Sequence, residues 1–179
     1  MKRRDLSRLP LKANDGGVRV VIETPLGSFN KYDYNRDLDI FEVKEMLPRG
    51  SEFPFDFGFF PSTLGEDGDP VDALPLSDRG LDIGAVVSTR LIGVIEFADE
   101  KHADTIRNDR LIAVPTISVI YKKITTLEDL PPALIKQIES FFELDAYFKG
   151  KKRKFLGRGD AKAAIALLNK GKAALRKNS

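Results

Sequence analysis

The stretch Gly65-Glu66-Asp67-Gly68-Asp69-Pro70-Val71-Asp72 places three aspartates within six residues, between glycines and a proline. We call residues 65–72 the acidic loop. A residue before a proline is restricted to an extended conformation, and residues two apart in an extended segment point the same way. We therefore expect Asp67 and Asp69 to project together, with Asp72 where apolar sequence resumes.

Two interpretations of the acidic loop remain open from its residues alone. Carboxylates this close repel each other unless a cation lies between them, and oxygen ligands suit Mg²⁺, Mn²⁺ or Ca²⁺. Aspartate, glycine and proline are also the commonest residues of solvated turns. An EF-hand calcium loop is excluded, because Val71, Asp72 and Asp78 stand where it needs a ligand, an invariant glycine and a closing glutamate.

The composition describes one soluble globular domain, with 42% hydrophobic and 31% charged residues in a chain of 179. The net charge of +2 favours neither the presence nor the absence of a nucleic-acid partner. Because cysteine is absent and His102 is the single histidine, thiolate sites, disulfides and multi-histidine zinc sites are excluded. Residues 1–13 form a basic arm without a signal-peptide core, and no apolar run could span a bilayer. We expect a cytoplasmic protein without membrane association.

Several short strands are predicted in the first two thirds of the chain. Alternating apolar residues predict a strand over residues 18–23, which ends in Glu23. Strands over 29–34 and 38–46 join at a turn, and Lys31 and Asp33 share a face of the first. Residues 53–61 hold two prolines, so we expect them to wrap the core and not to form a central strand. Further strands are expected at 85–94, 111–115 and 117–121, with a polar loop at 96–110.

Two helices are predicted at the end of the chain. The first starts at residues 129–132, with Asp129 as its capping residue, and carries apolar residues at helical spacing up to Phe142. The second starts at Gly159-Asp160, after a basic stretch at 149–154. Strands followed by helices predict an α+β fold that is mainly β, a small twisted β-barrel with two C-terminal helices packed against it.

Residues 67–72 also carry the pattern Asp-Gly-Asp-Pro-hydrophobic-Asp, and other recognisable segments accompany it in order. These are the strand that ends in Glu23, Asn30-Lys31-Tyr32-Asp33, residues 53–58, residues 93–115 and Phe141-Phe142-Glu143. Together they resemble the family I soluble inorganic pyrophosphatases over residues 18–154.

The resemblance implies one domain over residues 1–179 with a highly twisted OB-like β-barrel and flanking helices. It implies Mg²⁺-dependent hydrolysis of inorganic diphosphate to two phosphates, with Mn²⁺ as an alternative metal. It further implies a homo-oligomer, with the hexamer that is common among bacterial relatives as one candidate form, and no nucleic-acid partner.

The resemblance also implies roles for individual residues. Asp69 would be the general base, and Asp67, Asp72 and Asp99 would bind metal. The remaining candidates for the metal shell are Glu23 and Asp33, acting through water, together with Asn108 and Asp109. The candidates for substrate binding are Lys31, Lys44, Phe57, Arg110, Tyr147 and Lys149.

Several of these residues depart from the family pattern. Phe53 and Phe57 stand where the family has tyrosines, and Asp33 stands for a glutamate. Lys44 is near a family arginine, which gives up bidentate phosphate geometry.

The second metal-binding segment and the last substrate-binding segment depart further. Asn108 stands where the family has a metal-bridging aspartate, and Asp109, one residue later on a strand, would face the opposite way. A family Tyr-Lys pair is replaced by residues of the segment 144–146, so Tyr147 and Lys149, one helical turn on, are the substitutes.

Three functions are therefore compared. A divergent pyrophosphatase is preferred, because the whole acidic loop is kept. A hydrolase of another phosphoanhydride would explain a pocket made more apolar by Phe53 and Phe57. A non-catalytic OB-like module could bind nucleic acid through aromatics and the basic stretches 1–12 and 149–158, but it gives no reason for three aspartates on one loop.

Overall fold

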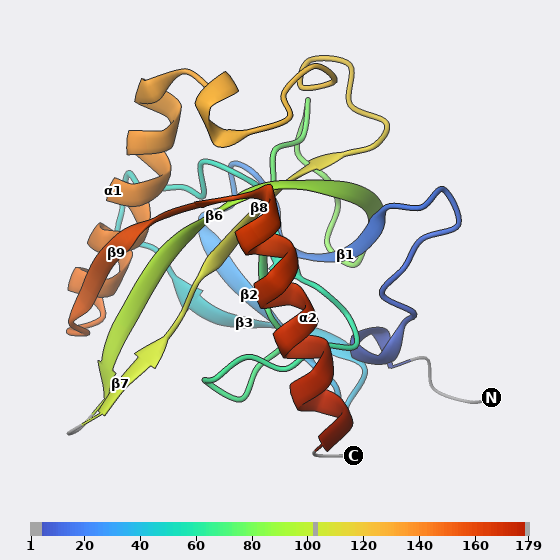
Figure 1. The fold of residues 1–179 in the computed structure, drawn as a ribbon. Coiled ribbons are helices and arrows are strands. Elements are labelled where there is room, and N and C mark those ends of the chain that lie inside the picture. The colour runs from blue at the N-terminus through green and yellow to red at the C-terminus, as the bar shows by residue number, and fades with distance from the viewer. Residues whose placement is uncertain (1–4, 102–103, 178–179) are drawn as a thin grey trace.

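The computed structural model describes residues 5–101 and 104–177, so the expectations for residues 1–4 and His102 lie outside the described part. Figure 1 shows a twisted sheet with α2 lying across it and α1 beside one end of β6 and β9. The strands are β1 (Val18–Thr24), β2 (Asn30–Asn35), β3 (Ile40–Met46), β4 (Phe57–Phe59), β5 (Asp72–Pro75), β6 (Val86–Lys101), β7 (Asp104–Arg107), β8 (Arg110–Pro115) and β9 (Arg153–Asp160). The helices are α1 (Pro132–Phe148) and α2 (Ala161–Lys177), with short 3-10 turns at Leu6–Arg8 and Leu127–Asp129.

Within the described residues, a ring of five strands closes on itself. The strands follow one another in the order β1, β4, β5, β8 and β6, and β6 pairs back with β1. All these pairings are antiparallel except that of β5 with β8. A small closed ring of this kind is an OB-like barrel, so the predicted fold class is confirmed.

The prediction of a polar loop at residues 96–110 is wrong. Strand β6 runs for 16 residues and continues past residue 94, where the predicted strand ends, and its far half pairs with β7 on one side and β9 on the other. Phe97 and Ala98 on this half are buried and hold the strand against the core. The many acidic residues around them gave the segment the composition of a loop. Strand β9 was not predicted at all, because Lys154, Phe155 and Leu156 are exposed and the segment lacks an alternating apolar pattern.

The expectation that residues 53–61 cannot form a central strand is also wrong. Strand β4 lies between β1 and β5, and pairs with both. The two prolines, Pro54 and Pro61, lie outside its three residues, so they remove no ladder hydrogen bond. At Gly58 the neighbouring backbone approaches so closely that an added Cβ would lie 1.9 Å from the carbonyl oxygen of Val21.

Gly58→Ala is therefore expected to lower the free energy of unfolding by about 1–3 kcal/mol, the usual cost of overpacking. The upper end is expected, because the obstacle is backbone and cannot rotate away. Urea denaturation of the variant and the wild type measures the difference. An unchanged unfolding midpoint would contradict the strand pairing of β4 with β1.

Residues 117–121 form turns and not the expected strand. The carboxylate of Asp78 accepts hydrogen bonds from the backbone N–H groups of Val119 and Ile120, and holds them in a loop. The side chain of Val119 is 81% exposed, so no apolar face is buried there that could fix a strand.

The two predicted helices are confirmed, but Asp129, the predicted cap of the first, does not cap it. The carboxylate of Asp160 accepts a hydrogen bond of 2.8 Å from the N–H of Ala163 at the start of α2. Asp129 instead binds the N–H groups of Thr125 and Thr126, in the 3-10 turn before α1. The N-cap position of α1 is Pro131, which offers no side-chain oxygen.

The helices cover two parts of one barrel core. Helix α1 contributes Ile138 and Phe142 to a cluster with Phe57 and Phe97, at the end of the barrel beside β9. Helix α2 contributes Ala164 and Leu168 to a second cluster with strands β1, β5 and β8. The described part of the N-terminal arm covers the barrel as well, since the N–H of Arg19 donates to the carbonyl of Leu11. No helix in the described ranges has both the length and the apolar character that crossing a bilayer requires.

Candidate active site

One cavity of about 760 Å³ brings together most of the predicted site residues. It lies between the acidic loop, the β2–β3 hairpin, the start of β8 and the segment from α1 to β9. The predicted residues that line it are Glu23, Lys31, Asp33, Lys44, Phe57, Asp67, Asp69, Asp72, Asn108, Arg110 and Lys149. Asp99, Asp109 and Tyr147 are not among its lining residues.

The acidic loop reaches the cavity through a turn and not through the extended segment that was expected. Gly68 has a φ of 93°, a conformation that suits glycine, and the N–H of Asp69 donates to the carboxylate of Asp67 at 3.1 Å. The N–H of Gly65 closes the loop on the carbonyl of Asp69 at 2.7 Å. Asp67 and Asp69 still line the same cavity, because the turn and not the strand alternation sets their direction.

Asp72 is the first residue of β5 and forms an ion pair with Arg110, the first residue of β8. Burial raises the pKa of Asp72 despite the neighbouring Arg110 and Lys31. Burial also raises the pKa of Asp67, and repulsion from Asp72 adds to the effect. Two adjacent carboxylates with raised pKa values form a site that a cation would stabilise.

Arg110 is held among aromatic rings as well as by Asp72. Its guanidinium carbon lies 4.9 Å from the ring centroid of Phe142 and 5.6 Å from that of Phe57. The Nζ of Lys31 also lies 5.6 Å from the ring centroid of Phe57. The ring face of Phe57 therefore contacts both Lys31 and Arg110 through cation–π interactions. A tyrosine hydroxyl is not needed for either contact.

The β2–β3 hairpin supplies a second group of charges. Asp33 lies between two lysines, 3.6 Å from the Nζ of Lys31 and 3.0 Å from that of Lys44. Burial would raise the pKa of Asp33, but the two lysines outweigh it and the pKa is lowered. Glu23 accepts a hydrogen bond of 2.8 Å from the N–H of Tyr34, yet burial raises its pKa to about 8.

Asp99 is engaged by an arginine that the sequence did not single out. The Nε and Nη2 atoms of Arg153 lie 2.6 and 2.7 Å from the two carboxylate oxygens of Asp99. Asn108 adds a hydrogen bond of 2.8 Å from its amide nitrogen. Burial opposes the effect of Arg153, but the guanidinium prevails and the pKa of Asp99 is lowered. Arg153 lines the cavity in place of Asp99.

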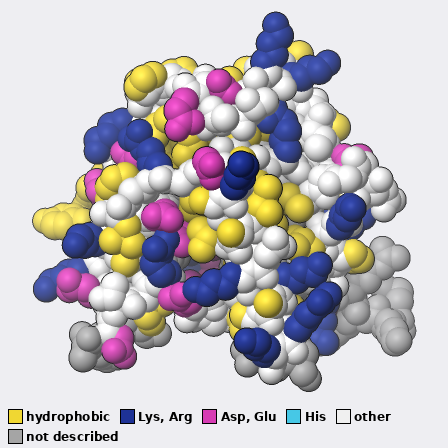
Figure 2. All heavy atoms as spheres, viewed as in Figure 1, with side chains coloured by type: hydrophobic (Ala, Val, Ile, Leu, Met, Phe, Trp, Pro, Cys, Tyr) yellow, Lys and Arg dark blue, Asp and Glu magenta, His cyan; other side chains and the backbone are white. Residues whose placement is uncertain are grey.

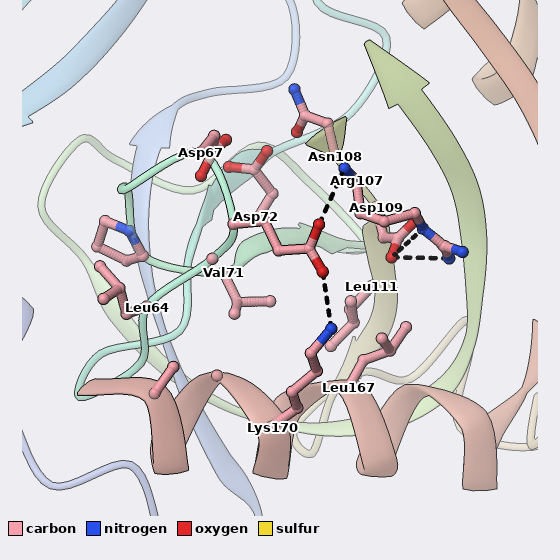
Figure 3. A pocket seen from close by; sticks show the side chains of 15 residues that line it. Leu64, Asp67, Val71, Asp72, Arg107, Asn108, Asp109, Leu111, Leu167 and Lys170 are labelled. Carbon is pink, nitrogen blue, oxygen red and sulfur yellow. Dashed lines mark hydrogen bonds and ion pairs between the residues drawn. The ribbon is translucent and has the colours of Figure 1, made fainter. Parts of the chain in front are cut away.

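Asp109 and Tyr147 are not brought to the cavity. Asp109 faces away from it, as predicted, although Asn108 and Asp109 lie between β7 and β8 and not on the expected strand, and there Asp109 accepts hydrogen bonds from the N–H of Phe97 and from the side chain of Arg107. Figure 3 shows Asp109 turned to Arg107, on the side of a second pocket of about 290 Å³ between the acidic loop and α2. Tyr147 is 75% exposed and packs against Phe148, so the helical turn carries it to the surface.

Lys149 does reach the cavity from the end of α1. Its Nζ lies 2.7 Å from a carboxylate oxygen of Asp145 and 2.8 Å from one of Glu45. Asp145 also lines the cavity, and it belongs to the segment 144–146 that replaces the family Tyr-Lys pair. The end of α1 therefore brings Lys149 to the cavity but not Tyr147.

The donor set on the acidic loop fits a hard divalent cation, because Asp67, Asp69 and Asp72 are carboxylates that line one cavity. Within residues 5–101 and 104–177, no three acidic or histidine side chains already stand together as a metal cage. Asp99 does not fit such a role as it stands, since Arg153 holds both of its oxygens.

Glu23→Gln is expected to remove a pH dependence of stability in the metal-free protein. The folded protein keeps the Glu23 proton up to about pH 8, whereas the unfolded chain releases it near the ordinary pKa of 4.5. Between these values folding takes up a proton, so the stability of the wild type falls as pH rises. Urea denaturation in chelator measures the free energy of unfolding of both proteins. The value for the variant minus that for the wild type should rise from about pH 5 to 8 and then stay constant. A pH-independent difference would contradict the burial of Glu23.

Comparisons with known proteins show the family to which the chain belongs. The family model described as inorganic pyrophosphatase matches residues 20–176. The inorganic pyrophosphatase of Thermus thermophilus is 39% identical over 151 residues, which are 83% of this chain and 84% of that protein. That of Synechocystis is 32% identical over 164 residues, covering 92% and 95%. The crystal structure of the Thermus thermophilus inorganic pyrophosphatase superposes with a TM-score of 0.87 at 35% identity, covering 97% of this chain and 99% of that one. The chain therefore belongs to the inorganic pyrophosphatase family.

Proposed function

We propose that this chain hydrolyses inorganic diphosphate to two phosphates in the cavity beside the acidic loop. The observation that carries the proposal is the meeting of Asp67, Asp69 and Asp72 with lysines and an arginine from other elements in one cavity. The family match over residues 20–176 supports the same reaction. The substrate is a small polyanion, and a hydrolase of it needs both cations to hold the phosphates and a carboxylate to activate water.

The acidic loop would hold the metal. Pyrophosphatases of family I depend on metal ions, and we assign Mg²⁺, with Mn²⁺ as the alternative, to Asp67 and Asp72. A divalent cation bound there would neutralise phosphate charge and lower the pKa of water. Glu23 and Asp33 lie on neighbouring strands of the same cavity, where they would contact the metal through water.

The cationic side chains would bind and orient the phosphate groups. Lys31, Lys44 and Lys149 line the cavity from the hairpin and the end of α1. Arg110 is fixed by Asp72 and two aromatic rings, and its Nε is buried without a hydrogen-bond partner among the described residues. Fixed donors stabilise developing negative charge without reorganising during the reaction, which makes Arg110 the strongest candidate for that role.

Asp69 would take the proton from the attacking water. Among the described residues, no hydrogen bond or ion pair to its side-chain carboxylate is present, whereas Asp72 and Asp99 are paired with arginines. Its backbone is held by the turn at Gly68, so the carboxylate is positioned while its oxygens stay available to accept a proton. Direct attack by water requires no covalent intermediate.

We also propose that the chain forms a homo-oligomer, with a hexamer as the expected form. Phe29, Val43 and Met46 on and beside the β2–β3 hairpin are 65%, 51% and 76% exposed, which supports burial of this surface by another copy. Light scattering on the purified protein measures the mass directly. The cytoplasmic location stays a prediction.

Phosphate release from diphosphate, ADP and ATP, each with Mg²⁺, tests the proposed substrate. Diphosphate should be cleaved with the highest kcat/KM, because the cavity offers cations to both phosphates. Faster cleavage of a nucleotide would favour a hydrolase of another phosphoanhydride. Salt-sensitive binding of single-stranded DNA without any hydrolysis would favour the nucleic-acid module. On the face shown in Figure 2, acidic side chains lie among the basic ones on the left, whereas basic side chains without acidic neighbours gather at the lower right.

A further inference from the structure

Asp99 and Arg153 are fixed opposite each other by the sheet. They are register partners in the antiparallel pairing of β6 with β9, so the backbone brings their side chains together. The guanidinium meets the carboxylate through two parallel hydrogen bonds of 2.6 and 2.7 Å. This fork-to-fork geometry is the strongest form of the arginine–carboxylate pair.

The rest of the Arg153 side chain is held as firmly. It is 5% exposed, and its guanidinium carbon lies 5.7 Å from the ring centroid of Phe97. The carbonyl of Phe142 accepts a further, longer hydrogen bond of 3.5 Å from Nη1. Arg153 is therefore a buried and hydrogen-bonded part of the cavity wall.

The ion pair with Arg153 limits the capacity of Asp99 to bind a metal ion. Both of its oxygens already accept hydrogen bonds from Arg153, and a third hydrogen bond comes from Asn108. A divalent cation at Asp99 would have to displace the guanidinium and would lie beside its charge. Arg153 instead faces the cavity and acts electrostatically on Asp72, at the acidic loop.

We propose that Arg153 takes the place of a divalent cation at Asp99, so that this chain binds divalent cations at the acidic loop and not at Asp99. The inference rests on the proposed function, in which positive charge in this cavity neutralises diphosphate. Part of that charge is then built into the chain, and the remainder comes from a metal held by Asp67 and Asp72.

Metal binding without substrate tests this directly. The probe is Mn²⁺, titrated into metal-free protein while the free ion is followed by electron paramagnetic resonance. Arg153→Met should bind one Mn²⁺ more per chain than the wild type, because Asp99 is released. The matched control is Arg158→Met, since Arg158 lies on the same strand, pairs with Glu139 and does not line the cavity. This control should bind the same number of ions as the wild type.

A second variant keeps the test decisive if Arg153→Met does not fold. Asp99→Asn in the otherwise unchanged chain should lose no Mn²⁺, because Asp99 is not a ligand while Arg153 is present. Loss of one ion in Asp99→Asn, or an unchanged count in a folded Arg153→Met, would overturn the proposal. Neither readout depends on hydrolysis, so a failure of the proposed function and a failure of this inference remain distinguishable.

Discussion

Asp69→Asn is expected to lower kcat for diphosphate hydrolysis by about 10²- to 10⁴-fold, the contribution of a positioned general base. Asparagine keeps the size of the side chain but cannot accept the proton of the attacking water. The turn that holds position 69 uses the backbone of that residue and the side chain of Asp67, so the fold of the loop survives the change. Steady-state phosphate release at saturating Mg²⁺ measures the effect.

Glu66→Gln is the matched control for Asp69→Asn. It makes the same carboxylate-to-amide change on the same loop, but Glu66 pairs with Lys170 at 2.7 Å and lines the second pocket. Its kcat should stay close to that of the wild type. An Asp69→Asn variant as active as Glu66→Gln would remove Asp69 from the role of base.

Arg110→Met is expected to cost about 3 kcal/mol of unfolding free energy, the lower end of the cost of breaking a buried ion pair, because it leaves the mostly buried carboxylate of Asp72, whose side chain is 20% exposed, without its partner. Methionine restores part of the volume between Phe57 and Phe142, so the loss reports mainly on the ion pair. Urea denaturation of the metal-free protein near neutral pH measures it. The same variant should also lose most of its activity, since Arg110 is the proposed holder of phosphate charge.

Two further variants show whether the cost belongs to the Asp72–Arg110 pair. Lys170→Met removes a cation whose ion pair with Glu66 is largely exposed, and should cost less than about 1 kcal/mol. The double variant Asp72→Asn/Arg110→Met should recover part of the loss, because no unpaired carboxylate remains buried. A loss in Arg110→Met no larger than that in Lys170→Met would show that the pair contributes little.

Local sequence was sufficient for the parts of the fold that depend on neighbouring residues. The turn of the β2–β3 hairpin is closed by Asn35, whose side-chain oxygen accepts the N–H groups of Asp37 and Leu38. The start of α2 follows from the capping oxygen of Asp160. The backbone conformation of the acidic loop was mistaken, because Gly68 adopts a positive φ and turns the chain before Asp69.

Long-range pairing decided what the sequence could not reveal. The acidic second half of β6 is a strand because β7 and β9 pair with its two edges, and neither partner shows an apolar alternation of its own. Arg153 was missed for the same reason. It lies in a basic stretch, and only the register of β9 against β6 places it opposite Asp99, 54 residues earlier in the chain.

Aromatic side chains position two arginines at the candidate site. Phe57 and Phe142 flank Arg110, and Phe97 flanks Arg153, so aromatic faces position two guanidinium groups at one cavity. Each of these arginines also holds an aspartate that the family resemblance assigned to metal, Asp72 by Arg110 and Asp99 by Arg153. The site therefore combines two fixed guanidinium groups with one acidic loop, to which we assign the metal.

Phosphate release from diphosphate by the wild-type protein, measured in Mg²⁺ and again in excess chelator, tests the central claim most directly. Rapid release in Mg²⁺ and its loss in chelator is the predicted result, since the carboxylates of the acidic loop need a cation before the anionic substrate can approach. Absence of Mg²⁺-dependent release from a folded protein would contradict the assignment of this cavity as a diphosphatase site.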